Sequence, residues 1–379
     1  MEARNKMRRV VIIGGGLGGL LTCKALVERG MDPEDVVVID DRGPRRGSDN
    51  PGAMMHPFPG RLLAPKQGVI EAYQAASTLL DDQVEAFPSV ASFHGEIVRP
   101  LVEGAVGEAF ESSWREHRDD YPERISSRLV DRAQLQKLGP FSDDIERAIV
   151  YGPAYCIDLA GWLDRLTEAL QEGGVRFVAG RAEAVERRPT SWRVHLGGES
   201  IGARRCVLAV GTALDDWFPE LNIQPTGGAL LVVDAGGLEL EAAVSAGGHI
   251  APLGPDRWVA GATWWHDDEF ETVDDEQAGD AIVERVRHLV PQITDMERVR
   301  VWRGVRAVHA NDRRPLVGRV AAQKGLYVCA GFGSKGLLWA PLMARAMAGL
   351  IADGNAPPAF ANAQRLARRW WRPGPSLAL

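Results

Sequence analysis

The feature that most constrains the fold is a glycine-rich loop near the start of the chain. Gly14, Gly16 and Gly19 form GxGxxG between an apolar run, residues 9–13, and a segment, residues 17–29, with apolar residues every three or four positions. The run predicts a buried strand and the segment predicts a helix. The first glycine permits a tight turn, the second lets backbone amides approach a pyrophosphate, and the third lets helix and strand pack closely. The sequence therefore predicts a dinucleotide-binding unit.

An acidic residue stands where such a unit needs one. The second predicted strand, VVVID, ends at Asp40, about 20 residues beyond the glycines. Its carboxylate is suited to accept hydrogen bonds from the adenosine ribose, and its charge disfavours the 2′-phosphate of NADP. This unit alone leaves NAD and FAD open.

Composition narrows the class of protein. The 379 residues allow two domains or one large composite one, and the net charge of −7 does not indicate nucleic-acid binding over the whole surface. The cysteines are scattered without a CxxC pair, which predicts buried thiols and a reducing cytoplasm. Histidines are dispersed, so we expect no metal.

No apolar stretch reaches the roughly 18 residues of a membrane helix, and glycines interrupt the N-terminal run, so we expect a soluble protein without a signal peptide.

Later segments add helices and strands. Apolar spacing predicts helices over residues 67–87, 275–289 (with Ala281, Ile282, Val286 and Leu289 on one face) and 337–351. Residues 192–196 alternate as a strand, with a hairpin turn at the following GGES. Residues 206–211 and 326–331 predict buried strands, and residues 229–234 and 257–263 predict strands of a largely antiparallel sheet.

Two of these segments resemble known FAD proteins. CVLAVGTALDDW, residues 206–217, resembles the second conserved stretch of two-domain FAD proteins. RRPLVGRV, residues 313–320, and LYVCAGFGSKGLLWAPLMARAMAGLI, residues 326–351, are similar to the closing FAD motif of the D-amino-acid oxidase superfamily, which includes glycine and sarcosine oxidases. There a glycine-rich loop leads into a helix whose N-terminus stabilises the negative charge of reduced flavin. The resemblance implies FAD.

A closer resemblance is to the FAD domain of a tRNA-modifying enzyme that removes the carboxymethyl group from carboxymethylaminomethyl-uridine. It rests on GSDNPGAMMHPF, residues 47–58, GGHIAPLGPDRWVAGAT, residues 247–263, and GSKG with the APL that follows. The chain departs from that family in reading GSKG for the usual GSRG, and it lacks the methyltransferase domain that precedes the FAD domain in the two-activity version.

The resemblance implies a fold class and a set of FAD contacts. The expected fold is α/β (an α+β composite), with a Rossmann-like FAD-binding domain, residues 1–87, 151–217 and 307–379, and a largely antiparallel-sheet substrate domain, residues 88–150 and 218–306. Some flavin oxidases tether FAD through a cysteine where this chain has Ala307, so non-covalent FAD is expected. The expected FAD contacts are Gly14, Gly16, Leu17, Gly18, Gly19, Asp40, Asp41, Ser48, Asn50, Gly52, Ala53, Met54, Ala182, Ala209, Gly211, Gly331, Gly333, Ser334, Lys335 and Gly336.

The same resemblance points to candidate catalytic residues. Arg306 stands where amino-acid oxidases place the arginine that binds the substrate carboxylate, and Arg303 is the alternative. Lys335 offers either a second positive charge at the carboxylate or a solvated side chain. His249 stands where related oxidases place a tyrosine over the substrate, and His56 follows the loop expected nearest the flavin. For both histidines the alternative is a purely structural role.

We expect an FAD-dependent oxidoreductase that oxidises the C–N bond of a carboxylate-bearing amine or amino acid. Two substrates remain open, a free small amino acid and carboxymethylaminomethyl-uridine in tRNA. The C-terminal QRLARRWWRPG predicts either an amphipathic helix packing its tryptophans or an RNA-contacting tail. A flavin monooxygenase or reductase needs a second nucleotide site, for which the sequence gives no support, and a non-catalytic flavin-binding protein is the remaining alternative.

Overall fold

The chain folds into two compact units, each assembled from separate stretches of sequence. The computed structural model describes residues 8–44, 46–60, 68–101, 105–265, 272–320, 323–366 and 377–378. The first unit takes its described residues from 1–48, 163–226 and 305–379, and the second takes them from 49–162 and 227–304. The C-terminal residues 367–376, which hold most of the predicted arginine-rich tail, lie outside the described residues.

The first unit is built on a sheet with five parallel neighbours. Side by side these are β7 (Arg176–Ala179), β2 (Val36–Asp40), β1 (Arg8–Ile13), β10 (Glu199–Leu208) and β17 (Leu326–Ala330). Numbered along the chain, their order is 3-2-1-4-5, as in dinucleotide-binding folds. The four valine and isoleucine positions of β2 are all buried, since both faces of a parallel sheet are covered. The Rossmann-like half of the predicted fold is confirmed.

Antiparallel strands extend this sheet. β8 (Ala184–Arg187), β9 (Trp192–Leu196) and β10 form a meander, β18 (Leu377–Ala378) pairs with β8, and β16 (Leu316–Arg319) pairs with β17. Gly197 and Gly198 have φ of 52° and 78° and form the predicted turn between β9 and β10. A two-residue hairpin turn with positive φ at both positions favours glycine.

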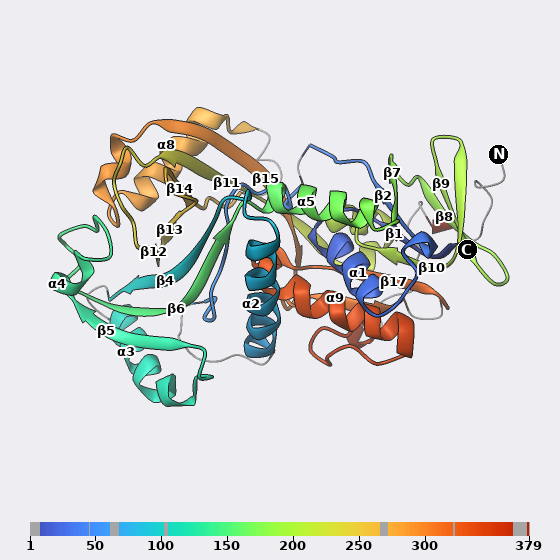
Figure 1. Cartoon of the computed structure of the whole chain (residues 1–379), viewed down its shortest axis with the longest axis horizontal. Coiled ribbons are helices and arrows are strands. Elements are labelled where there is room, and N and C mark those ends of the chain that lie inside the picture. Colours follow the sequence, from blue (N-terminus) through green and yellow to red (C-terminus); the bar gives the residue numbers. More distant parts are fainter. Residues whose placement is uncertain are drawn as a thin grey trace. The chain divides into compact units, whose positions relative to one another are not determined.

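Helices cover the parallel strands. α1 (Leu17–Glu28) and α9 (Gly336–Asp353) pack side by side in the first unit (Figure 1). α6 (Leu214–Trp217) follows β10, and α5 (Leu159–Glu172) contributes its residues from Leu163 onward. Both ends of the chain thus supply helices to one sheet.

The second unit is built on a mostly antiparallel sheet, as predicted. In spatial order its strands are β15 (Arg298–His309), β11 (Ile223–Asp234), β14 (Arg257–Gly261), β13 (Gly248–Pro252), β12 (Ala242–Ala246), β4 (Ser92–Pro100), β6 (Arg147–Ile157) and β3 (Ala53–Met55), with β5 (Ser126–Asp131) also paired to β6. The β4–β12 pair is parallel. β11 and β15 each begin or end in the first unit.

The helices of the second unit are α2 (Val69–Ala86), α3 (Ala105–His117), α4 (Arg132–Leu135) and α8 (Asp275–Val286). α8 starts at a capping box, in which the Asp274 carboxylate accepts from the Gln277 amide at 2.8 Å. It ends at Val286, short of the predicted residue 289, and Ala281 is exposed, whereas Ile282, Val286 and Leu289 are buried as predicted.

The unit boundaries differ from the predicted domain boundaries. Residues 49–87 and 151–162 belong to the second unit because β3 pairs with β6, with Ala53 opposite Ile157. The Tyr73 hydroxyl on α2 also donates to the Pro153 carbonyl of β6 at 2.8 Å. Residues 218–226 belong to the first unit, where Phe218 is buried in the core, and residues 305 and 306 belong there too.

Within the described residues, no helix is long and apolar enough to cross a membrane. The same part of the chain holds no group of three or more His, Cys, Asp or Glu side chains arranged to bind a metal ion.

Candidate cofactor and active site

The GxGxxG loop joins β1 to α1 in very close packing. A Cβ on Gly14, which has φ of 100°, would lie 2.3 Å from the Ala209 carbonyl oxygen. A Cβ on Gly19 would lie 1.8 Å from the Gly14 carbonyl oxygen. Neither position has room for a side chain, because real Cβ atoms never come so near an oxygen. The glycines thus bring the N-terminus of α1 directly over the end of the sheet.

The first turn of α1 has backbone N–H donors at its start and no acidic side chain. The helix has Gly16 as N-cap and no acidic residue in its first turn. The Leu17 amide donates to Ser48 Oγ at 3.0 Å, so Ser48 lies at the helix start, and its predicted contact with FAD stays a prediction. A helix N-terminus of this kind favours a phosphate.

Asp40 lies beside the same loop, and an arginine lies with it. Arg46 Nη1 is 2.7 Å from Asp40 Oδ2, and Arg46 Nη2 donates to the Gly15 carbonyl at 2.7 Å. The sequence analysis did not single out Arg46. The available signal was its place in the basic segment RGPRRG, directly after the strand that Asp40 ends.

A pocket of about 520 Å³ opens next to Asp40 in the first unit. It is lined by Gly15, Asp40, Arg42, Asp164, Thr167, Glu168, Gln171, Phe177, Val178 and Ala179. Of these, only Asp40 was an expected FAD contact. The residues from α5 and β7 were missed because β7, a four-residue strand, had not been predicted.

The later glycine-rich segments reach the same edge of this sheet. β10 and β17 are parallel to β1, and the Ala209 amide donates to the Ile13 carbonyl at 2.8 Å. Gly211, Gly331 and Gly333 all have positive φ. A Cβ on Gly18 would lie 2.8 Å from the ring of Phe332, so the GFGSKG loop contacts α1. Segments about 300 residues apart in the chain are thereby brought together.

Other expected FAD contacts lie elsewhere or have local roles. Asp41 is exposed and accepts from the Gly43 amide at 3.3 Å, and Ala182 packs partly buried against the core. Asn50 belongs to the second unit, where its side-chain oxygen accepts from the Gly52 amide at 2.8 Å. Ala53 and Met54 also belong to that unit, in β3. Their contact with FAD stays a prediction.

The two candidate arginines lie on β15 and differ in surroundings. Arg306 is partly buried, and burial lowers its pKa to about 10, so it stays charged at neutral pH. Arg303 forms an ion pair with Asp275 at 2.9 Å and donates to the Val273 carbonyl. Side chains three apart on a strand point to opposite faces. The ion pair of Arg303 favours Arg306 as the candidate for binding a carboxylate, and both roles stay predictions.

The remaining candidates divide between the units. Lys335 is the N-cap of α9 in the first unit. In the second unit, the ring of His249 lies over Gly261, where an added Cβ would approach it to 3.1 Å. His56 Nδ1 is 3.4 Å from the hydroxyl of Tyr151, and burial raises the pKa of that tyrosine to about 12. Each retains its predicted role as a hypothesis.

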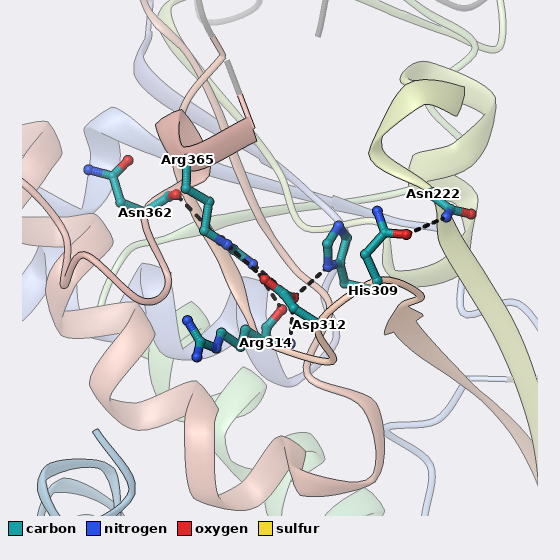
Figure 2. A network of polar contacts seen from close by, with 7 residues as sticks. Asn222, His309, Asp312, Arg314, Asn362 and Arg365 are labelled. Carbon is teal, nitrogen blue, oxygen red and sulfur yellow. Dashed lines mark hydrogen bonds and ion pairs between the residues drawn. The ribbon is translucent and has the colours of Figure 1, made fainter. Parts of the chain in front are cut away.

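A polar network follows Arg306 on the same strand. Figure 2 shows the Asp312 carboxylate between His309 and Arg365, with His309 Nδ1 at 2.6 Å and Arg365 Nε at 3.2 Å. The Arg314 amide donates to the same carboxylate at 3.0 Å. Partial burial would raise the pKa of Asp312, but the bonds from Arg365, Arg314 and His309 outweigh it and lower the pKa to about 2. The network ties η8 (Ala363–Leu366) to the end of β15.

We expect Asp312→Asn to destabilise the protein by about 1–2 kcal/mol at pH 7. The folded-state pKa lies below the usual 3.8, so the ionised carboxylate stabilises the fold above pH 4, and this contribution is lost as pH falls from about 4 to 2. Urea unfolding at pH 7 and at pH 3 measures the free energy of unfolding. Between these two pH values it should fall less in the variant than in the parent. Asp353→Asn, which removes an exposed ion pair with Arg29, is the matched control and should change little.

The arrangement in the first unit fits a dinucleotide. Tight glycines, the α1 N-terminus, Asp40 and the adjoining pocket together provide a phosphate cradle, a ribose acceptor and space for a base. In the same unit, the GFGSKG loop leads into α9, whose N-terminus is a second site that favours negative charge.

Comparison with known proteins agrees with this geometry. Residues 9–350 match the family described as FAD dependent oxidoreductase, DAO. The chain is 27% identical over 382 residues to the tRNA 5-methylaminomethyl-2-thiouridine biosynthesis bifunctional protein MnmC of Thiobacillus denitrificans, covering 92% of this chain and 57% of that protein. The corresponding protein of Idiomarina loihiensis is 26% identical, with 90% and 55% covered. The chain thus spans about half the length of these relatives.

Solved structures share the fold. Iminodiacetate oxidase from Chelativorans sp. BNC1 aligns with a TM-score of 0.80 at 17% identity, covering 98% of this chain and all of that one. Glycine oxidase from Geobacillus kaustophilus aligns with a TM-score of 0.80 at 19% identity, covering 97% and 99%. Since the family match extends over most of the chain, this protein belongs to the DAO family of FAD-dependent oxidoreductases and is a flavoenzyme with FAD as its cofactor.

Proposed function

We propose that the protein oxidises the C–N bond of a small amine that carries a carboxylate, such as an N-substituted glycine, with oxygen as electron acceptor in the cytoplasm. The carrying observation is Arg306, a charged and partly buried guanidinium on β15. The GFGSKG loop follows another strand, β17, and contacts β15 near this arginine. Val308, two residues on, forms a bridge with Phe332 of that loop. A guanidinium withdrawn from water attracts an anion more strongly than an exposed one. In this proposal the first unit, to which Arg306 belongs, binds FAD.

The chain's residues have positioning roles in this reaction. Arg306 clasps the carboxylate through two parallel hydrogen bonds and thereby fixes the neighbouring carbon. FAD bound in the first unit would supply the acceptor for the hydride that leaves this carbon. The amine must be neutral when its C–H bond breaks, and His249 and His56 are the candidate groups for holding its proton. The imine product is hydrolysed by water, which releases the amine fragment and an aldehyde or keto acid.

A second candidate substrate is carboxymethylaminomethyl-uridine in tRNA. It is supported by the relatives named for tRNA 5-methylaminomethyl-2-thiouridine biosynthesis, which match at least 90% of this chain. The reacting fragment is again a glycine-like secondary amine with a carboxylate, so the same role for Arg306 serves both substrates.

Anaerobic bleaching of the flavin absorbance separates these substrates. Glycine, sarcosine, proline and tRNA bearing the carboxymethylaminomethyl group are added in turn to the protein with its FAD. Bleaching by a free amino acid supports the small-molecule oxidase, and bleaching by the modified tRNA alone establishes the second candidate. Bleaching by NADH or NADPH but by no amine contradicts both and indicates a monooxygenase or reductase.

We expect the FAD to be bound without a covalent link. Ala307 stands where a tethering cysteine would be, and the four cysteines are free and buried, with burial raising the pKa of each thiol. A protonated buried thiol is a poor nucleophile. Acid precipitation should therefore leave all yellow colour in the supernatant, measured by its absorbance. Colour retained in the washed pellet would contradict the expectation.

A further inference from the structure

Arg46 lies at the edge of the glycine-rich loop and makes two short contacts there. Its Nη1 is 2.7 Å from Asp40 Oδ2 and its Nη2 donates to the Gly15 carbonyl at 2.7 Å. The side chains of Arg46 and Asp40 are only 17% and 19% exposed. A planar guanidinium held at both terminal nitrogens has a fixed position, unlike a solvated surface arginine.

The same guanidinium lies close to the start of α1. A Cβ built on Gly16 would be 4.0 Å from Arg46 Nη2 and 3.0 Å from Ser48 Oγ. Gly16 is the second glycine of the motif, at which the backbone approaches a pyrophosphate. Arg46 and Ser48 therefore border the point where the helix N-terminus favours phosphate.

The pocket beside Asp40 adds an independent indication of a ligand. It touches Gly15 and Asp40 and extends along Thr167 of α5 and Phe177 of β7. Its volume of about 520 Å³ is in the range of small-molecule sites. Arg46 contacts two of the residues that line this pocket, Asp40 and Gly15.

We propose that Arg46 is the phosphate-anchoring residue of the FAD site. A guanidinium binds phosphate oxygens with favourable geometry, because its N–H donors form a rigid planar fork. In this arrangement Asp40 recognises the ribose and Arg46 recognises the adjoining phosphate, while the ion pair keeps the Asp40 carboxylate oriented. The proposal rests on FAD as the cofactor and does not depend on which amine is oxidised.

Titration of the FAD-free protein with adenosine, AMP, ADP and FAD tests the proposal by calorimetry, without any amine substrate. We expect Arg46→Met to weaken ADP and FAD binding by about 10- to 100-fold, the range for a hydrogen bond to a charged group. The affinity for adenosine, which lacks a phosphate, should change by less than about threefold. Arg46→Lys keeps the charge but loses the planar pair of N–H donors. Its affinity for ADP and FAD should therefore lie between those of the unmodified protein and Arg46→Met.

Arg188→Met is the matched control. Arg188 belongs to the same unit but does not line the pocket, pairs with Glu186 at 2.8 Å and is 44% exposed. It should change ADP binding by less than about threefold. An equal loss for adenosine and ADP in Arg46→Met would overturn the proposal, because Arg46 would then act only through Asp40. Unchanged affinity for every ligand would also overturn it.

The unmodified protein gives a further test that requires no variant to fold. If a guanidinium holds the phosphate, ADP binding weakens as salt rises while adenosine binding does not. The salt dependence for ADP should be smaller in Arg46→Met, with circular dichroism confirming its fold. Salt dependence identical for ADP and adenosine in the unmodified protein would contradict a charged phosphate anchor.

Discussion

Replacing Arg306 with methionine is expected to lower kcat/KM for a carboxylate-bearing amine by about 100- to 5,000-fold. Removing one partner of a buried charge pair costs about 3–5 kcal/mol, and each 1.36 kcal/mol corresponds to a factor of ten. Methionine keeps the length and apolar character of the side chain but removes the charge and the hydrogen bonds. Anaerobic stopped-flow reduction of the flavin measures the effect directly, without the oxygen step.

Two comparisons make this result specific to carboxylate binding. The amide analogue of the same amine carries no negative charge and should lose less than about tenfold in Arg306→Met. Arg303→Met removes an arginine from the opposite face of β15, where it pairs with Asp275, and should change kcat/KM by less than about threefold. If kcat/KM falls strongly in Arg303→Met but changes little in Arg306→Met, then Arg303 rather than Arg306 binds the carboxylate.

Replacing Gly19 with alanine is expected to abolish FAD binding and to destabilise the first unit by at least about 3 kcal/mol. The added Cβ would lie 1.8 Å from the Gly14 carbonyl oxygen, and both atoms belong to backbone that cannot rotate away. Relief requires α1 to move off β1, which disturbs the packing on which the phosphate cradle depends. The readouts are the flavin-to-protein absorbance ratio and the urea unfolding midpoint.

Gly202→Ala is the control for this substitution. Gly202 lies in β10 of the same unit, and nothing lies within 4 Å of a Cβ at that position. This variant should keep its flavin and its unfolding midpoint. Full flavin content and an unchanged midpoint in Gly19→Ala would show that helix and strand separate at little cost, contrary to the close packing described here.

Local patterns predicted most of the elements that build the cofactor site. β1, β2, β9 and β17 follow from short apolar or alternating runs, and α1 and α9 follow from helical spacing after a glycine-rich loop. These elements depend on neighbours in the sequence, because a strand or helix is recognisable from the period of its own side chains. The fingerprint and Asp40 could therefore be located in advance.

The unit boundaries could not be read from such patterns. β3 is three residues long and carries no distinctive period, and its partner β6 lies about 100 residues later in the chain. Pairing with β6 places residues 49–87 in the second unit, whereas the sequence alone had grouped them with the first. Long-range strand pairing is decided by the packing of the whole sheet rather than by any one strand.

By itself the sequence determined most of the strands and helices around the glycine-rich loops, the turns themselves and the place of Asp40 at the end of β2. Only the tertiary structure decided which partners the charged residues near these loops have. Arg303 and Arg306 look alike in sequence, but Arg303 meets Asp275 while Arg306 lies on the other face of the strand. Arg46 reads as part of a polar loop until the chain folds it onto Gly15 and Asp40. The physical reason is that a charge takes its role from the partners and the burial around it, and these come from distant parts of the chain.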